Sequence, residues 1–222
     1  MQGEVLAADT GTHMNYQSSN DVTVKPLDPL LPDPAKPVTP IDPTDPSGPV
    51  AGTGGSLSLD FASGFQFGEQ AISTKNEIYY AQPQKYVDFD GVAKKGPNYV
   101  QVTDIRGTGA GWKLTVKQVA QFQTDEGQVL NGAELSFSQG EVISNLATDL
   151  SPTAVTSFTL PINSEVPVVT ANTEKGVGTW LYRFGSDEIS GGKSVVLQVP
   201  GKTVKYAKKY QTALTWTLKD VP

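Results

Sequence analysis

The sequence predicts an all-β fold, either an antiparallel β-sandwich or a partly open barrel of about ten strands, with at most one short helix. Three observations predict it. Short segments alternate apolar and polar residues, turn-forming residues separate them, and no helical apolar pattern continues beyond about two turns. The expected strands lie at 57–61, 77–81, 99–105, 111–116, 133–137, 156–160, 166–170, 180–184, 194–199 and 214–219. The segment 138–150 is the best candidate for a helix and could also be a loop.

The segment 57–61 illustrates the alternation that defines a strand. Leu57, Leu59 and Phe61 are expected on one face, with Ser58 and Asp60 on the other. The segments 133–137 and 180–184 show the same pattern with aromatic residues. Such strands bury one face in a core.

The chain divides by composition into three parts: a short polar segment at 1–25, a proline- and aspartate-rich spacer at 26–52, and a β domain at 53–222. Nine prolines recur from Pro26 to Pro49. Proline lacks a backbone donor and fixes φ, so the second part is expected to be extended, like polyproline, and outside any sheet interior. Within 1–25, residues 12–16 and 22–24 could each add a strand if the domain offers an edge.

Composition excludes several classes of protein. The 222 residues contain no cysteine, so neither disulfides nor thiolate zinc sites are possible. A net charge of −6 argues against a broad nucleic-acid interface. The segment 202–209 concentrates four lysines, which indicate either a solvated strand edge or a patch for an anionic polymer. No apolar run reaches the length of about 20 residues that a membrane helix needs. Ala7 and Ala8 suit the end of a signal peptide, or the start could be artificial.

Two tryptophan-containing strands are the most informative segments. Trp112 and Leu114 share one face, and so do Trp216 and Leu218, with threonine and lysine opposite. The strands lie about 104 residues apart, so pairing or stacking them would close the domain. Either the tryptophans belong to the core, or they are partly exposed and stack on sugars or fill a partner's pocket. The alternation favours the core.

Asp104 and Arg106 lie two residues apart and are therefore expected on the same strand face. A structural ion pair beside the turn at 107–111 is favoured over a ligand site. The glycines of this turn do not form a phosphate loop, because no Lys-Ser/Thr pair and no helix follow them.

The chain is not expected to be an enzyme, and neither a metal nor a cofactor is expected. His13 is its only histidine, which argues against a catalytic triad and excludes a histidine metal cluster. Neighbouring carboxylates look like turn residues; they are Asp88 with Asp90, Asp125 with Glu126, and Asp187 with Glu188. A glycoside hydrolase that uses two of the carboxylates remains an alternative.

The paired Trp-x-Leu motifs resemble the WxL family of Gram-positive cell-surface proteins. The resemblance extends to 102–107, which leads into Gly111 and Trp112, and to Tyr210-x-x-x-Leu214 before the last motif. It covers about 52–222. The motif residues are Trp112, Leu114, Trp216 and Leu218, and the supporting residues are Asp104, Arg106, Tyr210 and Trp180.

The resemblance implies a secreted protein that attaches non-covalently to peptidoglycan or another wall polymer, beside membrane-anchored partner proteins. We therefore expect a non-catalytic wall-binding protein at the cell surface. The alternative is an adhesin for a host matrix protein, or a subunit whose main contact is a membrane-anchored bacterial partner. An assembly subunit should expose an apolar patch.

Overall fold

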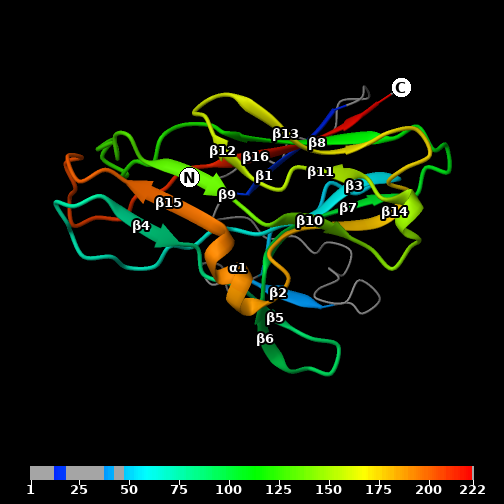
Figure 1. Ribbon diagram of the computed structural model, residues 1–222, viewed down its shortest axis with the longest axis horizontal. Helices are drawn as coiled ribbons and strands as arrows, with labels where there is room; N and C mark the ends of the chain where they lie inside the picture. Colours follow the sequence, from blue (N-terminus) through cyan, green and yellow to red (C-terminus); the bar gives the residue numbers. More distant parts are fainter. Residues whose placement is uncertain (1–12, 19–37, 43–47, 222) are drawn as a thin grey trace.

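The computed structural model describes residues 13–18, 38–42 and 48–221 (Figure 1). In this part of the chain, sixteen strands form four small sheets. One α-helix and one 3₁₀ turn complete the secondary structure of these residues. Every strand pairing within the sheets is antiparallel. None of the described helices is long and apolar enough to cross a membrane.

The four sheets are the motif sheet, the central sheet, the end sheet and the hairpin sheet. The motif sheet has the order β1 (His13–Ser18), β16 (Leu214–Asp220), β8 (Trp112–Gln118), β13 (Glu165–Ala171), β11 (Thr153–Ala154). The central sheet has the order β10 (Gly140–Ile143), β14 (Gly178–Phe184), β7 (Asn98–Asp104), β3 (Leu57–Ala62). The end sheet has the order β12 (Phe158–Leu160), β9 (Glu134–Phe137), β15 (Val195–Val199), β4 (Glu77–Tyr80). The hairpin sheet has the order β2 (Thr39–Ile41), β5 (Gln84–Val87), β6 (Ala93–Gly96).

The all-β prediction is confirmed, but a sandwich or barrel of about ten strands is wrong. The four small sheets are arranged in a propeller-like ring instead. The physical reason is that the strands are short, between two and seven residues. Frequent glycine and proline end them early, so the chain moves often from one sheet to another.

The main core joins the motif, central and end sheets. The central sheet is buried on both faces: Trp180 and Tyr182 of β14 contact the main core, whereas Leu181 faces a second cluster with Tyr86 of the hairpin sheet. A third cluster packs Leu197 and Val199 of the end sheet against the segment 122–133 and Tyr210. Alternation therefore predicted strands correctly, but did not reveal that both faces of β14 are covered.

The expected common face of Leu57, Leu59 and Phe61 is wrong. The pairing of β3 with β7 shifts register between Leu59 and Phe61, which leaves Asp60 as the extra residue. Such a bulge turns the following residues to the other face. Phe61 consequently lies in the second cluster beside Tyr99, with ring centroids 4.7 Å apart, while Leu57 and Leu59 remain in the main core.

The helix candidate at 138–150 is also wrong. That segment contains β10 and the 3₁₀ turn η1 (Thr148–Leu150). The one α-helix in the described residues is α1 (Glu188–Ser194), capped by Asp187, whose carboxylate accepts a hydrogen bond from the Ser190 backbone N–H. A seven-residue helix with two glycines carries too little apolar periodicity to be recognised from the sequence.

Two strands come from the segments predicted to precede the domain. β1 pairs with β16 along six residues, close to the strand expected at 12–16, whereas 22–24 lies outside the described residues. β2 falls inside the expected spacer, and two valines of that segment, Val38 directly before β2 and Val50, are buried. Pro40 is tolerated there because β2 is an edge strand that needs few backbone donors. At least this part of 26–52 belongs to the folded domain.

Candidate functional site

The two Trp-x-Leu motifs lie on neighbouring antiparallel strands. β8 and β16 pair so that Trp216 is opposite Val116, and Leu218 is opposite Leu114. Trp112 is opposite Asp220 at the end of the ladder. The predicted long-range closure of the domain is therefore made by direct pairing of the motif strands, which together form the middle of the motif sheet (Figure 1).

The four motif side chains are buried in the main core. Trp112 and Leu218 each expose 1% of their surface, and Leu114 and Trp216 expose none. Each large aromatic side chain buries roughly 150–250 Å². The structure thus supports the core interpretation. Neither indole is placed to stack on a sugar from the surface of the folded domain.

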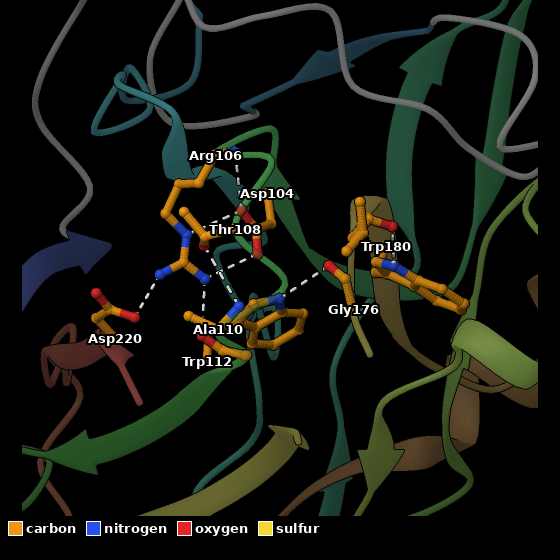
Figure 2. A network of polar contacts seen from close by, with 10 residues as sticks. Asp104, Arg106, Thr108, Ala110, Trp112, Gly176, Trp180 and Asp220 are labelled. Atoms are coloured by element: carbon orange, nitrogen blue, oxygen red, sulfur yellow. Dashed lines mark hydrogen bonds and ion pairs between the residues drawn. The ribbon is translucent and has the colours of Figure 1, made fainter. Parts of the chain in front are cut away.

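The indole N–H groups tie a loop to the core. Trp112 Nε1 donates to the Gly176 carbonyl at 2.9 Å, and Trp180 Nε1 donates to the Val177 carbonyl at 2.9 Å (Figure 2). These carbonyls are consecutive in the loop between β13 and β14. For Trp216 Nε1, no acceptor lies within hydrogen-bonding distance among the described residues. The three tryptophans therefore differ in their polar contacts although all three are buried.

Gly176 is a residue of this site that the sequence did not reveal. Its φ of +71° lies in the left-handed region, and a Cβ atom there would lie 2.6 Å from Trp112 Nε1. Gly111 is similar, since its Cβ would lie 2.4 Å from the Ala171 carbonyl oxygen. Only the lack of a side chain lets the loop backbone approach the indole. Nothing in the spacing of a single glycine predicts this contact.

Arg106 is the centre of a polar network beside Trp112 (Figure 2). Its Nε and Nη2 donate to the two carboxylate oxygens of Asp104 at 2.9 and 2.8 Å. Nη2 also donates to the Gly111 carbonyl at 2.7 Å, and Nη1 pairs with the Asp220 carboxylate. The predicted ion pair between Asp104 and Arg106 is present, but β7 ends at Asp104, so the expected common strand face is wrong. Asp220 is a third member that the sequence did not indicate.

This network fixes the ends of three strands. Asp104 ends β7, Gly111 precedes β8, and Asp220 ends β16. The hydrogen bond with Asp104, and after it the one with Asp220, outweigh desolvation and raise the pKa of Arg106 above its ordinary value. The guanidinium thus stays charged at any physiological pH. Since Asp104 is buried, loss of the arginine would leave a carboxylate without its cation, at a cost of about 3–5 kcal/mol.

The remaining predicted residues lie in two different places. Trp180 belongs to the same core as the motif residues. Tyr210 does not: it packs on the third cluster, and its hydroxyl accepts a hydrogen bond from the Tyr206 backbone N–H at 3.0 Å. The structure therefore brings together seven of the eight predicted residues, namely Trp112, Leu114, Trp216, Leu218, Asp104, Arg106 and Trp180, and leaves Tyr210 apart.

The lysine-rich segment 202–209 is a loop and not a strand edge. Lys205 Nζ donates to the carbonyls of Pro200 and Thr203 at 3.0 and 3.1 Å. The loop backbone therefore accepts hydrogen bonds from this ammonium group, which leaves fewer of its donors for a ligand. Lys208 pairs with Glu126. The segment therefore offers less free positive charge than its sequence indicates.

Two of the neighbouring carboxylates, Asp88 and Asp187, stabilise local structure. Asp88 holds the turn between β5 and β6: its side chain accepts from the Val92 N–H at 2.8 Å and pairs with Lys94 at 2.5 Å. The hydrogen bond from Lys94, and then those from the backbone, lower the pKa of Asp88. Asp187 caps a helix and does not lie in a turn. Hydrogen bonds from Ser190 lower the pKa of Asp187.

One buried carboxylate was missed by sequence reasoning. Asp60, in the β3 bulge, accepts hydrogen bonds from Ser58 at 2.5 Å, Gln101 at 2.9 Å and Thr103 at 2.5 Å. Three neutral donors replace the water that a surface carboxylate would have. Among the described residues, no group of three or more histidine or acidic side chains is arranged to hold a metal ion.

The geometry defines a class of protein: an all-β domain in which two paired Trp-x-Leu strands lie in the core. The sequence matches the family described as WxL domain, surface cell wall-binding, over residues 7–222. Because the match covers nearly the whole chain, this protein belongs to the WxL family. No curated protein and no solved structure matches the chain in the same comparisons. The family match includes β1 and β2 with the segments around them.

Proposed function

We propose that this protein is a non-catalytic, secreted protein of the Gram-positive surface that binds peptidoglycan non-covalently. The observation that carries the proposal is membership of a cell wall-binding family over residues 7–222. In the mechanism we propose, the buried motif strands act as a rigid support, and residues exposed on other elements contact the wall. The burial of Trp112 and Trp216 favours this division of roles.

A binding experiment with purified sacculi tests the proposal. The full chain is incubated with sacculi that carry teichoic acid and with sacculi stripped of it, at low and at high salt. Retention on stripped sacculi at high salt is expected, because neutral contacts are not screened by ions. Binding that disappears with teichoic acid or with salt would point to an anionic polymer. Release of soluble wall fragments during incubation would contradict the non-catalytic assignment.

A second candidate function is assembly with another surface protein, either a membrane-anchored bacterial partner or a host matrix protein. The tip of the β5–β6 hairpin favours it. Phe89 is 68% exposed there, and Val92 is also exposed. Hydrogen bonds to Asp88 hold this tip in one conformation, so an aromatic anchor is presented at low entropic cost. If a membrane-anchored partner is the ligand, Phe89→Ala should weaken its binding and leave sacculus binding unchanged.

A further inference from the structure

The end sheet has one face in the core and an outer face that is open to solvent. Its inward residues, such as Leu135 and Leu197, lie in the core clusters, so the alternate residues point outward. One row crosses all four strands in the order Tyr80, Val196, Ser136, Thr159, and a second row has the order Ile78, Gln198, Glu134. In Figure 1 this sheet forms the left end of the molecule, with β4 at its lower edge.

The chemistry of the face is mixed along each row. Ile78 and Tyr80 are 55% and 49% exposed, and both point outward from the same strand. Both lie on the edge strand β4. Across the sheet, polar groups occupy the rows further from this edge, with the hydroxyls of Ser136 and Thr159 in one row and the amide of Gln198 in the other. The hydroxyl oxygens of Ser136 and Thr159 lie 2.9 Å apart. With neighbouring strands about 4.8 Å apart, a row of four spans about 14 Å, long enough for more than one sugar ring.

The charge of this face selects among possible occupants. Glu134 is the only charged residue at the outward positions of these four strands, and no lysine or arginine stands there. An anionic polymer such as teichoic acid would therefore find no cation on the strands. A neutral polysaccharide matches better: sugar C–H faces pack on aromatic and aliphatic surface, and hydroxyl and amide groups fix the orientation.

We propose that the outer face of the end sheet binds the glycan strand of peptidoglycan, with Tyr80 and Ile78 as the apolar platform and Gln198, Ser136 and Thr159 as the polar contacts. This inference rests on the proposed wall-binding function and names the site and the ligand class. The glycan lies across the strands, along the row that begins at Tyr80. The stem peptides and teichoic acid take no part in this contact.

The test uses the full chain and two probes: stripped sacculi, and glycan strands freed from their stem peptides by an amidase. The variants are Tyr80→Ala and Gln198→Ala, with Phe89→Ala as a matched control that removes an exposed aromatic ring elsewhere. Tyr80→Ala should weaken binding to both probes about tenfold, equivalent to about 1.4 kcal/mol. Gln198→Ala should also weaken both, and Phe89→Ala should bind like the wild type. Urea unfolding of each variant checks that the fold is intact.

The outcomes separate this inference from the proposed function. If the wild-type protein does not bind stripped sacculi, wall binding through peptidoglycan fails, and the inference fails with it. If the wild type binds sacculi but not the freed glycan strands, or if Tyr80→Ala and Gln198→Ala bind as tightly as the wild type, wall binding stands and the glycan face is overturned. Binding of both probes that is lost in these two variants and kept in Phe89→Ala supports the site.

Discussion

At the scale of single residues, Trp112 and Trp216 make different polar contacts in the same core. Replacing either tryptophan by phenylalanine removes the same volume. Only Trp112→Phe also removes a hydrogen bond, the one to the Gly176 carbonyl. We expect Trp112→Phe to lower the free energy of unfolding by about 1–2 kcal/mol more than Trp216→Phe. Urea denaturation of both variants measures the difference, and an equal or larger loss in Trp216→Phe would contradict it.

The loop beneath Trp112 depends on a glycine, and a second glycine offers a control. Gly176 and Gly91 both have positive φ, +71° and +79°. A Cβ atom at Gly91 meets nothing within 4 Å, whereas at Gly176 it would crowd Trp112 and Ala171. Gly91→Ala should therefore cost only the backbone strain of about 1–2 kcal/mol. Gly176→Ala should cost about 1–3 kcal/mol more because of the overpacking. Thermal unfolding compares them, and similar losses would show that the loop moves away from the indole.

At the scale of elements, helix α1 carries a pH-dependent cap. The pKa of Asp187 is lowered in the folded protein by hydrogen bonds from Ser190. A lowered folded pKa means that the stabilisation is present above the unfolded value of about 3.9 and is lost as the pH falls through the folded pKa. Asn also caps helices but does not titrate. Asp187→Asn should therefore lack this acid-dependent loss. Unfolding curves between about pH 2 and pH 6 test it; parallel pH profiles of the two proteins would refute the cap's role.

The elements also show what the sequence could and could not predict. Alternation located most strands, because one buried face suffices to impose it. It misplaced Phe61, since a bulge at Asp60 depends on how β3 meets β7 and has no local signature. The pairing of Trp112 and Trp216 strands was foreseen as a way to close the domain. The contact of Asp220 with Arg106 was not predicted, because it depends on the register that places Asp220 opposite Trp112.

The number of sheets could not be predicted from alternation either. Assigning all the strand segments to one sandwich or barrel assumes that each strand has a single buried face. Leu181, between Trp180 and Tyr182, is buried against a different sheet. Trp180, Leu181 and Tyr182 form a continuous apolar run, which is typical of a strand covered on both faces, but alternation assigns the aromatic residues alone to the core face. Counting only one buried face per strand therefore leads to a sandwich or a barrel, where the structure has four sheets.

At the scale of the whole molecule, the motif strands belong to a core that three sheets share. A cavity made there weakens the packing of all three sheets at once, because each of them contributes side chains to this core. The proposed glycan face has the opposite character: Tyr80 is on an edge strand and half exposed, so its truncation should leave the core unchanged. Loss of wall binding can therefore arise in two physically different ways, and stability separates them.

Trp216 lies in the shared core, so its truncation tests whether wall binding depends on stability alone. Trp216→Ala should lower the free energy of unfolding by about 3–5 kcal/mol, a large share of the roughly 5–15 kcal/mol that holds a domain together. At a temperature where the variant is still folded, we expect it to bind sacculi as the wild type does. Between the two melting temperatures, only the wild type should bind. Sedimentation with sacculi at both temperatures, alongside circular dichroism, measures this. A Trp216→Ala variant that is fully folded and does not bind would show that the buried motif shapes the wall contact directly, beyond supporting the fold.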